Sequence, residues 1–365
     1  MKHVDHFHGS DLEKIEQIYH IKKEEITSFS ANVNPLGISY KLRETLSSHI
    51  DAITTYPDRE YTDLRKAIAS YAETDYNNII VGNGSSELIS ILIQLRNPQK
   101  ALILGPTYSE YEREISLTGG SCHYFPLKEE EDFSLNLDSL FQELHSDLDL
   151  LILCNPNNPT STQIFSHEMR KILDVCIQKN IFVMVDETYV EFTEKMEEIT
   201  SVPLTNYYNN IIILRGISKF FAAPGLRLGY AIYGNQDLIC KINQKKNPWT
   251  INSLAAIAGE IMFSDKEYIT ATKQLITTER SHVCNALAAC PDLKVYPCHA
   301  NFTLVRSLSS NVNADHLFDV AIRNKFMIRN CSSFPFLDNQ YFRICFMSPD
   351  KNEELIRLIL SQFSS

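Results

Sequence analysis

The chain has 365 residues, which is enough for one large domain and a smaller one. Its 34 basic and 45 acidic side chains give a formal net charge of −11, which disfavours a nucleic-acid or anionic-membrane surface but leaves room for a small anionic substrate held by local cations. The nine cysteines are scattered, odd in number and without a C-x-x-C pair, so they indicate neither a disulfide framework nor a metal site.

The sequence shows no pattern of a targeting or membrane segment. Its start lacks the apolar core of a signal peptide, and no apolar stretch approaches the roughly 18 residues of a membrane span. Scattered cysteines fit a reduced compartment. We therefore expect a cytoplasmic protein.

Residues 1–50 are irregular apart from one expected helix from Asp11 to about Tyr19. From about residue 60 to 235, short apolar runs alternate with amphipathic segments, and several runs are apolar on both faces, as in a covered, mostly parallel sheet. The runs that we interpret as strands are Ile79–Val81, Ala101–Leu104, His123–Leu127, Leu150–Cys154, Ile181–Val185, Ile211–Leu214 and Leu228–Tyr233. The segments that we interpret as helices are 62–74, 86–96, 109–119, 166–179 and about 252–291.

After residue 292 the pattern becomes that of a second, α+β unit. The expected strands there are Lys294–Pro297, Asn301–Arg306, Met327–Arg329 and Tyr341–Phe346, with helices near 313–324 and at 351–363. We expect an α/β fold in three parts. They are an N-terminal segment (1–45) that packs with the small domain, a large domain (46–255), and a small C-terminal domain (256–365) that a long connecting helix opens.

A glycine-rich turn follows the first expected strand. In Gly82–Glu87, glycines let the backbone approach a ligand, and Ser85 and Ser86 can cap the next helix and offer hydroxyls. Free N–H groups at a helix start favour an anion, so Gly84, Ser85 and Ser86 are candidates for a phosphate cradle. The alternative is an ordinary loop with a serine cap.

Two further motifs follow strands. Tyr108, after Ala101–Leu104, could stack on a planar ring, although simple packing is the commoner role for such an aromatic. In Cys154–Thr160, two prolines fix the backbone while three amides project. Asn158 could donate to a phenolate oxygen, and a plain turn is the alternative.

Asp186 ends a buried strand, where a carboxylate is costly unless it is paired. A protonated pyridine nitrogen is a suitable partner, because the carboxylate keeps it protonated and the ring can then accept electrons from a substrate carbon. Tyr189 would point toward an oxygen on that ring. The alternative is a structural salt bridge.

Lys219 lies just past a strand end, where α/β proteins place their chemistry. Flanking phenylalanines would strip part of its hydration, which favours the neutral amine that attacks an aldehyde. Arg227 offers paired donors for a phosphate. An aldehyde with a phosphate arm describes pyridoxal phosphate (PLP), whereas a surface lysine beside a loop arginine is the alternative.

Arg343 lies inside an otherwise apolar strand of the late unit and needs an anion. A substrate α-carboxylate held by two parallel hydrogen bonds would serve, and an internal salt bridge is the alternative.

With these residues in place, the chain resembles the fold-type I PLP enzymes, in the class I and II aminotransferase group, from Phe29 to Phe346. Within that group it is similar to the threonine-phosphate decarboxylase and histidinol-phosphate aminotransferase branches. Ser30–Gly37 is similar to the N-terminal signature of the decarboxylases, and the motifs that favour the decarboxylase branch are His8-Gly9, Pro248–Asn252 and Ile328–Phe334.

The resemblance implies a large domain with a mostly parallel seven-stranded sheet between helices. It makes Lys219 the residue bonded to PLP, pairs Asp186 with the pyridine nitrogen, brings Asn158 and Tyr189 to the ring oxygen and stacks Tyr108 on the ring. It assigns the cofactor phosphate to Gly84, Ser85, Ser218 and Arg227. Tyr56 would reach the phosphate in a neighbouring subunit, which implies a homodimer with shared active sites.

The same resemblance implies that Arg343 holds the α-carboxylate and that Arg329, with His8 and Asn32, binds the phosphate end of the substrate. The implied reaction is the decarboxylation of a phosphorylated amino acid, L-threonine O-3-phosphate, in cobalamin biosynthesis. Transamination of an amino acid or of histidinol phosphate is the alternative, and a non-catalytic binding protein is a remoter one.

Four positions depart from the pattern of the family. The family often has a hydroxyl three residues before the lysine, where this chain has Gly216, and a glycine where it has Ser161. Phe336 stands where glycine is expected, and Met347 lies in a region where the decarboxylases usually show a second arginine. These departures leave the cofactor site intact and bear on the substrate.

Overall fold

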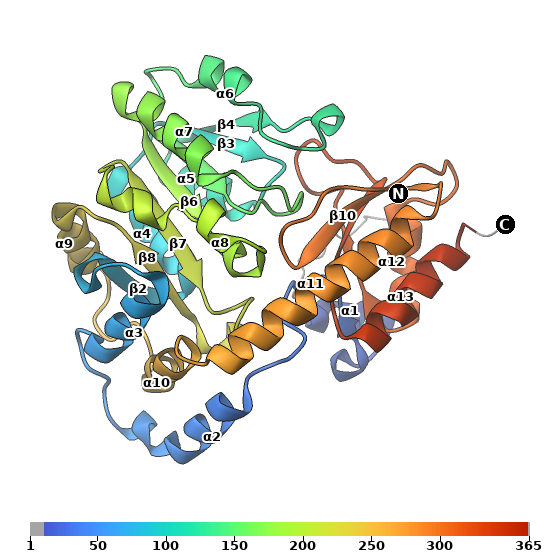
Figure 1. Ribbon diagram of the computed structural model, residues 1–365, viewed down its shortest axis with the longest axis horizontal. Helices are drawn as coiled ribbons and strands as arrows, with labels where there is room; N and C mark the ends of the chain where they lie inside the picture. Colours follow the sequence, from blue (N-terminus) through green and yellow to red (C-terminus); the bar gives the residue numbers. More distant parts are fainter. Residues whose placement is uncertain (1–10, 364–365) are drawn as a thin grey trace.

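The computed structural model describes residues 11–363, and its largest element is a seven-stranded sheet (Figure 1). The strand order is β2-β8-β7-β6-β5-β3-β4. The pairings among β4, β3, β5, β6 and β7 are parallel, whereas β8 runs antiparallel to both of its neighbours. The strands are β2 (Ile79–Asn83), β3 (Lys100–Gly105), β4 (Ser121–Pro126), β5 (Leu150–Cys154), β6 (Phe182–Asp186), β7 (Ile211–Gly216) and β8 (Leu228–Ile232).

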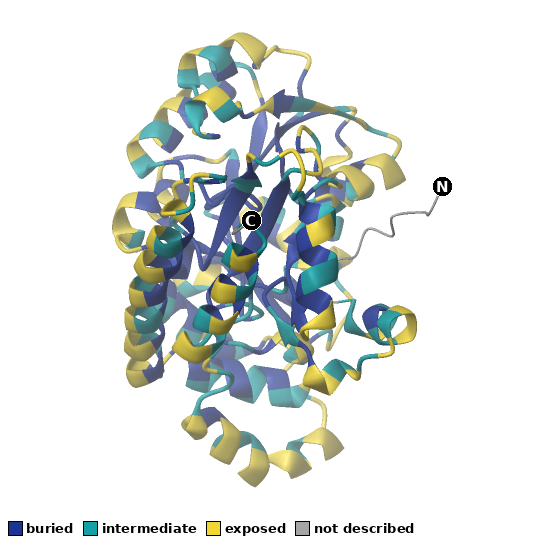
Figure 2. Cartoon of the chain, turned by 90° about the vertical axis from the view of Figure 1, so that its right-hand side faces the viewer, coloured by how far each residue is buried: buried dark blue, intermediate teal, exposed yellow. Residues whose placement is uncertain are grey.

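Helices cover both faces of this sheet because its central strands are apolar on both sides. Along β5, Leu151 and Leu153 join one buried cluster, whereas Leu150 and Ile152 join the other. The strands are accordingly buried throughout the centre of the molecule (Figure 2). The first face carries α3 (Thr62–Ala72), α7 (Ser166–Gln178) and α10 (Ser253–Met262), and the second carries α4 (Gly84–Arg96), α5 (Glu110–Leu117) and α9 (Gln236–Lys245).

The strand ends that carry the motifs lie together, at the carboxyl ends of the parallel strands. The parallel strands β3, β5, β6 and β7 end there, at Gly105, Cys154, Asp186 and Gly216. The antiparallel strand β8 starts at this same end of the sheet, because Gly229 pairs with Gly216 and with Gly82 near the end of β2. The predicted common placement of the motifs is therefore confirmed.

A second sheet of four strands, in the order β12-β13-β10-β9, belongs to the C-terminal part of the chain. Its strands are β9 (Leu293–Val295), β10 (Phe302–Ser307), β12 (Arg329–Asn330) and β13 (Tyr341–Cys345). The helices beside it are α11 (Lys266–Ala288), α12 (Ala314–Arg323) and α13 (Pro349–Ser361) (Figure 1). The N-terminal segment joins this part through β1 (Thr27–Ser28), which pairs in parallel with β11 (Phe326–Met327).

The single helix expected over about 252–291 is wrong, because two helices occupy that stretch. α10 ends at Met262 and α11 begins at Lys266. Between them the hydroxyl of Ser264 donates to the carbonyls of Glu260 and Ile261, and the Asp265 side chain accepts from the backbone N–H of Tyr268, which caps α11. Short polar side chains therefore end one helix and begin the next.

The sequence analysis also missed four short helices. They are α2 (Tyr40–Ser48), α6 (Leu137–Glu143), α8 (Met196–Ile199) and α9. The first helix, α1 (Leu12–Tyr19), matches its expected range. The domain boundaries expected near residues 45 and 255 stay predictions. Among residues 11–363, no helix is long and apolar enough to cross a membrane.

Candidate functional site

The turn between β2 and α4 forms a cradle with the loop before β8. Gly84 adopts a left-handed φ of +74°, and a Cβ added to it would lie 2.4 Å from Nη2 of Arg227. A Cβ on Gly229 would lie 2.3 Å from the backbone nitrogen of Ser85. Because only glycines permit these approaches, the guanidinium of Arg227 lies directly at the N-terminus of α4. This arrangement suits an anion such as a phosphate.

The predicted serine caps are wrong, because α4 starts at Gly84 and places both serines within its first turn. Asn83 is the cap residue and makes no side-chain capping bond. Ser85 is half-buried beside the cradle, Ser86 is exposed, and Ser218 is half-buried just before Lys219. Ser85 and Ser218 thus remain the better-placed hydroxyls for a bound phosphate.

Asp186 is a buried carboxylate that lacks a cationic partner among residues 11–363. Its Oδ2 accepts a 2.7 Å hydrogen bond from the Tyr111 hydroxyl, and its Oδ1 accepts from the backbone N–H of Thr188 at 2.9 Å and from the Thr188 hydroxyl. Burial raises the pKa of Asp186, against the opposing effect of these donors. A protonated pyridine nitrogen would supply the missing positive charge.

Tyr111 is a residue of this site that the sequence analysis missed. It is fully buried in α5, three residues after Tyr108, and their rings meet edge-on with centroids 5.6 Å apart. No local pattern marks it, because Tyr108 precedes α5 and the contact of Tyr111 with Asp186 joins residues 75 apart in the chain.

Lys219 is half-buried, and its amine donates a 2.6 Å hydrogen bond to the carbonyl of Ala31. Burial, assisted by the positive charge of Arg343, lowers the pKa of Lys219 to about 8. A substantial fraction of this amine is therefore neutral near pH 8, as nucleophilic attack requires.

Tyr108 links the cradle to Asp186. Burial raises the pKa of Tyr108 to about 12, Glu110 and Asp186 add to the rise, and Arg227 opposes it. The half-buried Tyr108 ring packs edge-on against Tyr111, whose hydroxyl donates to Asp186. A ring that stacks on the cofactor would lie close to that carboxylate.

The three amides of Cys154–Thr160 divide their roles. Asn155 bonds to the backbone of Ile164, and Asn157 bonds to the Pro106 carbonyl and to Thr107, so both hold the loop itself. The Oδ1 of Asn158 accepts from Arg343, and no described residue accepts from its Nδ2. Asn158 is thus the amide whose donor is available to a ligand.

Arg343 and Arg329 are direct cross-strand partners in β13 and β12. Arg343 is 4% and Arg329 8% exposed, yet neither forms an ion pair with a carboxylate of residues 11–363. Arg343 donates to the Ser30 carbonyl at 2.6 Å and leaves its buried Nε without a partner, while Arg329 donates to the Ser333 hydroxyl at 2.8 Å. Burial lowers the pKa of Arg329 to about 10, with Arg343 contributing and Asp11 opposing, so Arg329 is a cation at neutral pH.

The segment after β1 closes the site from the N-terminal side. Asn32, at a left-handed φ of 55°, donates from Nδ2 to the Tyr189 hydroxyl at 3.3 Å. Burial raises the pKa of Tyr189, with Arg343 as the main opposing charge. The buried Oδ1 of Asn32 and the Ser30 hydroxyl have no hydrogen-bond partner, so polar groups face the site unsatisfied.

One predicted residue within 11–363, Tyr56, does not join this cluster. Tyr56 is 80% exposed and packs its ring against Trp249, with centroids 4.9 Å apart. His8 lies outside the described residues. The remaining predicted residues form one group around the ends of β2, β5, β6 and β7 and the face of β12 and β13.

Each departure from the family pattern has a definite surrounding. Phe336, at a left-handed φ of 67°, rests its ring edge-on against Tyr124 and is 56% exposed. A Cβ on Gly216 would come no closer than 3.5 Å to Leu228 O, so a hydroxyl side chain would have space there. Met347 lies beside the Cys345 sulfur at 3.8 Å, and its backbone N–H donates to Asn352.

Ser161, the fourth departure, also has a left-handed φ, of 61°. Its hydroxyl accepts from the backbone N–H groups of His299 at 3.0 Å and Ala300 at 2.9 Å. The backbone carbonyl of Ser161 also accepts from the His299 N–H at 3.0 Å. Ser161 therefore ties the Asn158 loop to the strand connection before β10, and its hydroxyl adds the bond from Ala300 that a glycine could not make.

We expect Ser161→Ala to lower the free energy of unfolding by about 1–3 kcal/mol, because it leaves the buried N–H of Ala300 without an acceptor, whereas the His299 N–H keeps the backbone carbonyl of residue 161. Urea unfolding would measure this loss. Ser161→Gly is the matched control, since it also loses the acceptor but adopts the left-handed φ without strain, and it should lose less. A Ser161→Ala protein as stable as the wild type would contradict the proposed tie.

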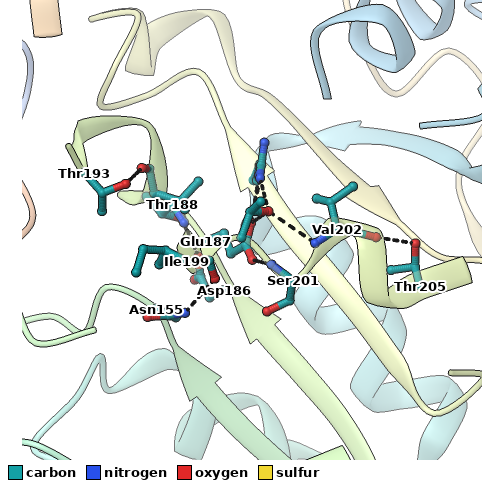
Figure 3. A network of polar contacts seen from close by, with 12 residues as sticks. Asn155, Asp186, Glu187, Thr188, Thr193, Ile199, Ser201, Val202 and Thr205 are labelled. Carbon is teal, nitrogen blue, oxygen red and sulfur yellow. Dashed lines mark hydrogen bonds and ion pairs between the residues drawn. The ribbon is translucent and has the colours of Figure 1, made fainter. Parts of the chain in front are cut away.

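A buried polar network lies behind Asp186 (Figure 3). Glu187 is fully buried and forms a 2.7 Å ion pair with Nη2 of Arg215. Its other oxygen accepts from the backbone N–H of Ser201 at 2.6 Å, and the Thr200 hydroxyl donates to the pair. Because Glu187 follows Asp186 in the chain, this network holds the end of β6 against β7.

Glu191, in the turn after β6, is a second buried carboxyl near this network. It is 1% exposed, and its Oε2 has no hydrogen-bond partner. Burial raises the pKa of Glu191 to about 7, against the opposing charge of Arg215. In the unfolded chain a glutamate has a pKa of about 4.3.

The raised pKa predicts how stability varies with pH. The contribution of Glu191 to the free energy of unfolding is fully present below its unfolded pKa and is lost as the pH rises through its folded pKa of about 7. Above that pH the carboxyl is ionised in both the folded and the unfolded state. Between pH 5 and pH 8 the wild type should therefore lose roughly 3 kcal/mol of stability that Glu191→Gln keeps, because glutamine does not titrate. Urea unfolding at several pH values would test this, and parallel profiles for the two proteins would contradict it.

The comparisons with known proteins agree with this geometry. Residues 24–359 match the family described as aminotransferase class I and II. Over 349 residues the chain is 32% identical to threonine-phosphate decarboxylase of Salmonella typhimurium, covering 96% of this chain and 94% of that protein. The crystal structure of the histidinol-phosphate aminotransferase from Clostridium acetobutylicum has a TM-score of 0.85 at 31% identity, covering 92% of this chain and 98% of that one.

A further solved structure, histidinol-phosphate aminotransferase from Sinorhizobium meliloti in complex with pyridoxal-5'-phosphate, has a TM-score of 0.83 at 19% identity and covers 96% of this chain and 95% of that one. The fold is that of the fold-type I PLP enzymes. The chain belongs to the class I and II aminotransferase family, whose cofactor is PLP. The residues present fit that cofactor, since the cradle at Gly84 and Arg227 and the unpaired Asp186 carboxylate match its phosphate and its pyridine nitrogen.

Proposed function

We propose that this protein is a PLP-dependent decarboxylase of a phosphorylated amino acid, converting L-threonine O-3-phosphate to aminopropanol phosphate and CO2 in cobalamin biosynthesis. The observation that carries the proposal is the cross-strand pair of Arg329 and Arg343. Two buried guanidinium groups on one face suit a substrate with two anionic groups, here a carboxylate and a phosphate. The similarity to a threonine-phosphate decarboxylase supports the same substrate.

Each residue of the site then has a chemical role. Bound PLP supplies an electron sink for the bond that breaks at the substrate α-carbon. Asp186 holds the positive charge of the pyridine nitrogen, and the guanidinium at the N-terminus of α4 holds the cofactor phosphate. Arg343 exchanges its bond to the Asn158 oxygen for the substrate carboxylate, and the Nδ2 of Asn158 donates to the cofactor ring oxygen.

Lys219 performs the proton transfer. Its pKa of about 8 lets the amine both accept and return a proton near neutral pH. After CO2 leaves, protonated Lys219 donates to the α-carbon. If the α-hydrogen were lost instead, the neutral amine would accept that proton and the outcome would be transamination.

Transamination is the second candidate function. Its support is the 31% identity to the histidinol-phosphate aminotransferase structure and the fact that Lys219 can serve either reaction. Histidinol phosphate carries a phosphate but no carboxylate. In a histidinol-phosphate aminotransferase, Arg343 would therefore bind a carboxylate only in the half-reaction in which an amino acid is the substrate.

The two functions are separated by their products. The PLP-loaded protein would be incubated with O-phospho-L-threonine while CO2 and aminopropanol phosphate are measured, and separately with glutamate while 2-oxoglutarate is measured. We expect CO2 from the first incubation. Release of 2-oxoglutarate without CO2 would contradict the decarboxylase proposal and support the aminotransferase.

Arg329→Ala tests the assignment of the phosphate. We expect kcat/KM for O-phospho-L-threonine to fall roughly 10–100-fold, mainly through KM, because a charged hydrogen bond is lost. Unphosphorylated threonine is the matched control substrate and should be used about equally well by both proteins. An equal loss on the two substrates would place the phosphate elsewhere.

We also propose a homodimer in which Tyr56 of one subunit reaches the cofactor phosphate of the other. Two observations support this. Tyr56 is 80% exposed, and its ring contacts Trp249 rather than the candidate site of its own chain. Light scattering would give the molar mass. Mixed dimers of Tyr56→Phe and Lys219→Ala chains should recover one intact site, and no recovery would contradict sharing.

A further inference from the structure

One pair of cysteines lies in contact, although all nine are free. The Sγ atoms of Cys284 and Cys298 are 3.2 Å apart. Cys284 is in α11, and Cys298 lies in the connection between β9 and β10. A disulfide needs an S–S distance of about 2.0 Å, so a movement of about 1 Å would join them. No other pair of cysteine sulfurs among residues 11–363 has a recorded contact.

The surroundings make one sulfur the better nucleophile. The hydrogen bond from Cys298 lowers the pKa of Cys284, and the guanidinium of Arg280, one helical turn earlier, acts in the same direction. The pKa of Cys298 is raised, mainly by that same hydrogen bond. Both side chains are half-buried, so a small reagent can reach them. Either sulfur can donate in this contact, and we assign the attack to Cys284, the thiol whose pKa is lowered.

We infer that Cys284 and Cys298 form a reversible thiol–disulfide switch that reacts with small-molecule disulfides such as oxidised glutathione. The Cys284 thiolate attacks one glutathione sulfur, forms a mixed disulfide and releases one glutathione thiolate. Cys298 then gives up its proton and attacks the Cys284 sulfur, which displaces the second glutathione thiolate. Two protein thiols are oxidised to one disulfide, and one glutathione disulfide is reduced to two thiols.

The position of the pair connects this switch to the candidate site. Arg280 donates to the carbonyls of His299 and Ala300, and both of their N–H groups donate to Ser161. The next residue, Asn301, donates from its side chain to the carbonyl of Asn32. A disulfide at Cys298 would thus tie α11 covalently to the connection that braces both the Asn158 loop and the N-terminal segment.

The test equilibrates the PLP-loaded protein in glutathione buffers of increasing oxidised fraction, followed by acid quenching, alkylation and tryptic mapping. Cleavage after Arg280, Lys294 and Arg306 would place Cys284 and Cys298 in peptides 281–294 and 295–306. We expect these two peptides to be disulfide-linked, with the loss of two alkylatable thiols, and to separate on reduction. We also expect the oxidised protein to have a higher thermal midpoint than the reduced protein.

Peptide 281–294 also contains Cys290, so Cys290→Ser is the matched control and should keep the link. Cys284→Ser should abolish the link and leave the thermal midpoint insensitive to the buffer. The inference is overturned if Cys284 and Cys298 stay alkylatable, or carry separate glutathiones, in a buffer that has already modified the exposed Cys240. It is equally overturned if the link in wild type runs through Cys290.

Discussion

Replacing Lys219 by alanine should lower turnover at least 10⁴-fold and leave the protein folded. Its amine donates to the Ala31 carbonyl, and burial lowers its pKa to about 8, which prepares it to exchange a proton at the substrate α-carbon. Borohydride reduction gives a second readout, since it should fix the cofactor to the peptide that contains Lys219 in the wild type and to no peptide in Lys219→Ala.

Lys246→Ala is the matched control for this experiment. Lys246 is also a lysine whose pKa burial lowers to about 8, but its neighbouring charges are Glu87, Arg65 and Glu60 rather than Arg343. Its replacement should retain most of the activity and the borohydride label. A Lys219→Ala enzyme within 100-fold of wild type would show that another residue transfers the proton.

Replacing Glu187 by alanine should produce the largest loss of stability, about 3–5 kcal/mol. Arg215 is 1% exposed and has Glu187 as its ion-pair partner, so the change leaves a buried guanidinium without that partner, and the remaining nearby carboxyl, Glu191, has a pKa raised to about 7. Its Nη1 already lacks a hydrogen-bond partner, which leaves it little capacity to compensate. Urea unfolding at constant pH would measure the loss.

Two further variants show whether the loss of stability arises from the burial of this ion pair. Glu198→Ala breaks an exposed ion pair with Lys195 and should cost less than about 1 kcal/mol. A double variant, Glu187→Leu with Arg215→Met, removes both charges and should be markedly more stable than Glu187→Ala. If Glu187→Ala costs no more than Glu198→Ala, the network does not hold β6 against β7.

Local pattern was sufficient for the elements of the large sheet. All seven expected strands are present, because runs such as Ile211–Leu214 can be buried on both faces only between two layers of helices. The long helix was misjudged because its apolar period continues across Ser264, whereas the interruption depends on two side-chain hydrogen bonds. Caps and breaks of this kind alter the backbone without altering the hydrophobic pattern.

The sequence by itself determined the residue types of the site and their placement at strand ends, because both are properties of short segments. Only the tertiary structure decided the partners. It set Arg329 opposite Arg343, turned Tyr111 toward Asp186 and gave the Ser161 hydroxyl two distant N–H groups. Those contacts join residues far apart in the chain, and their geometry follows from sheet register and helix packing rather than from any local pattern.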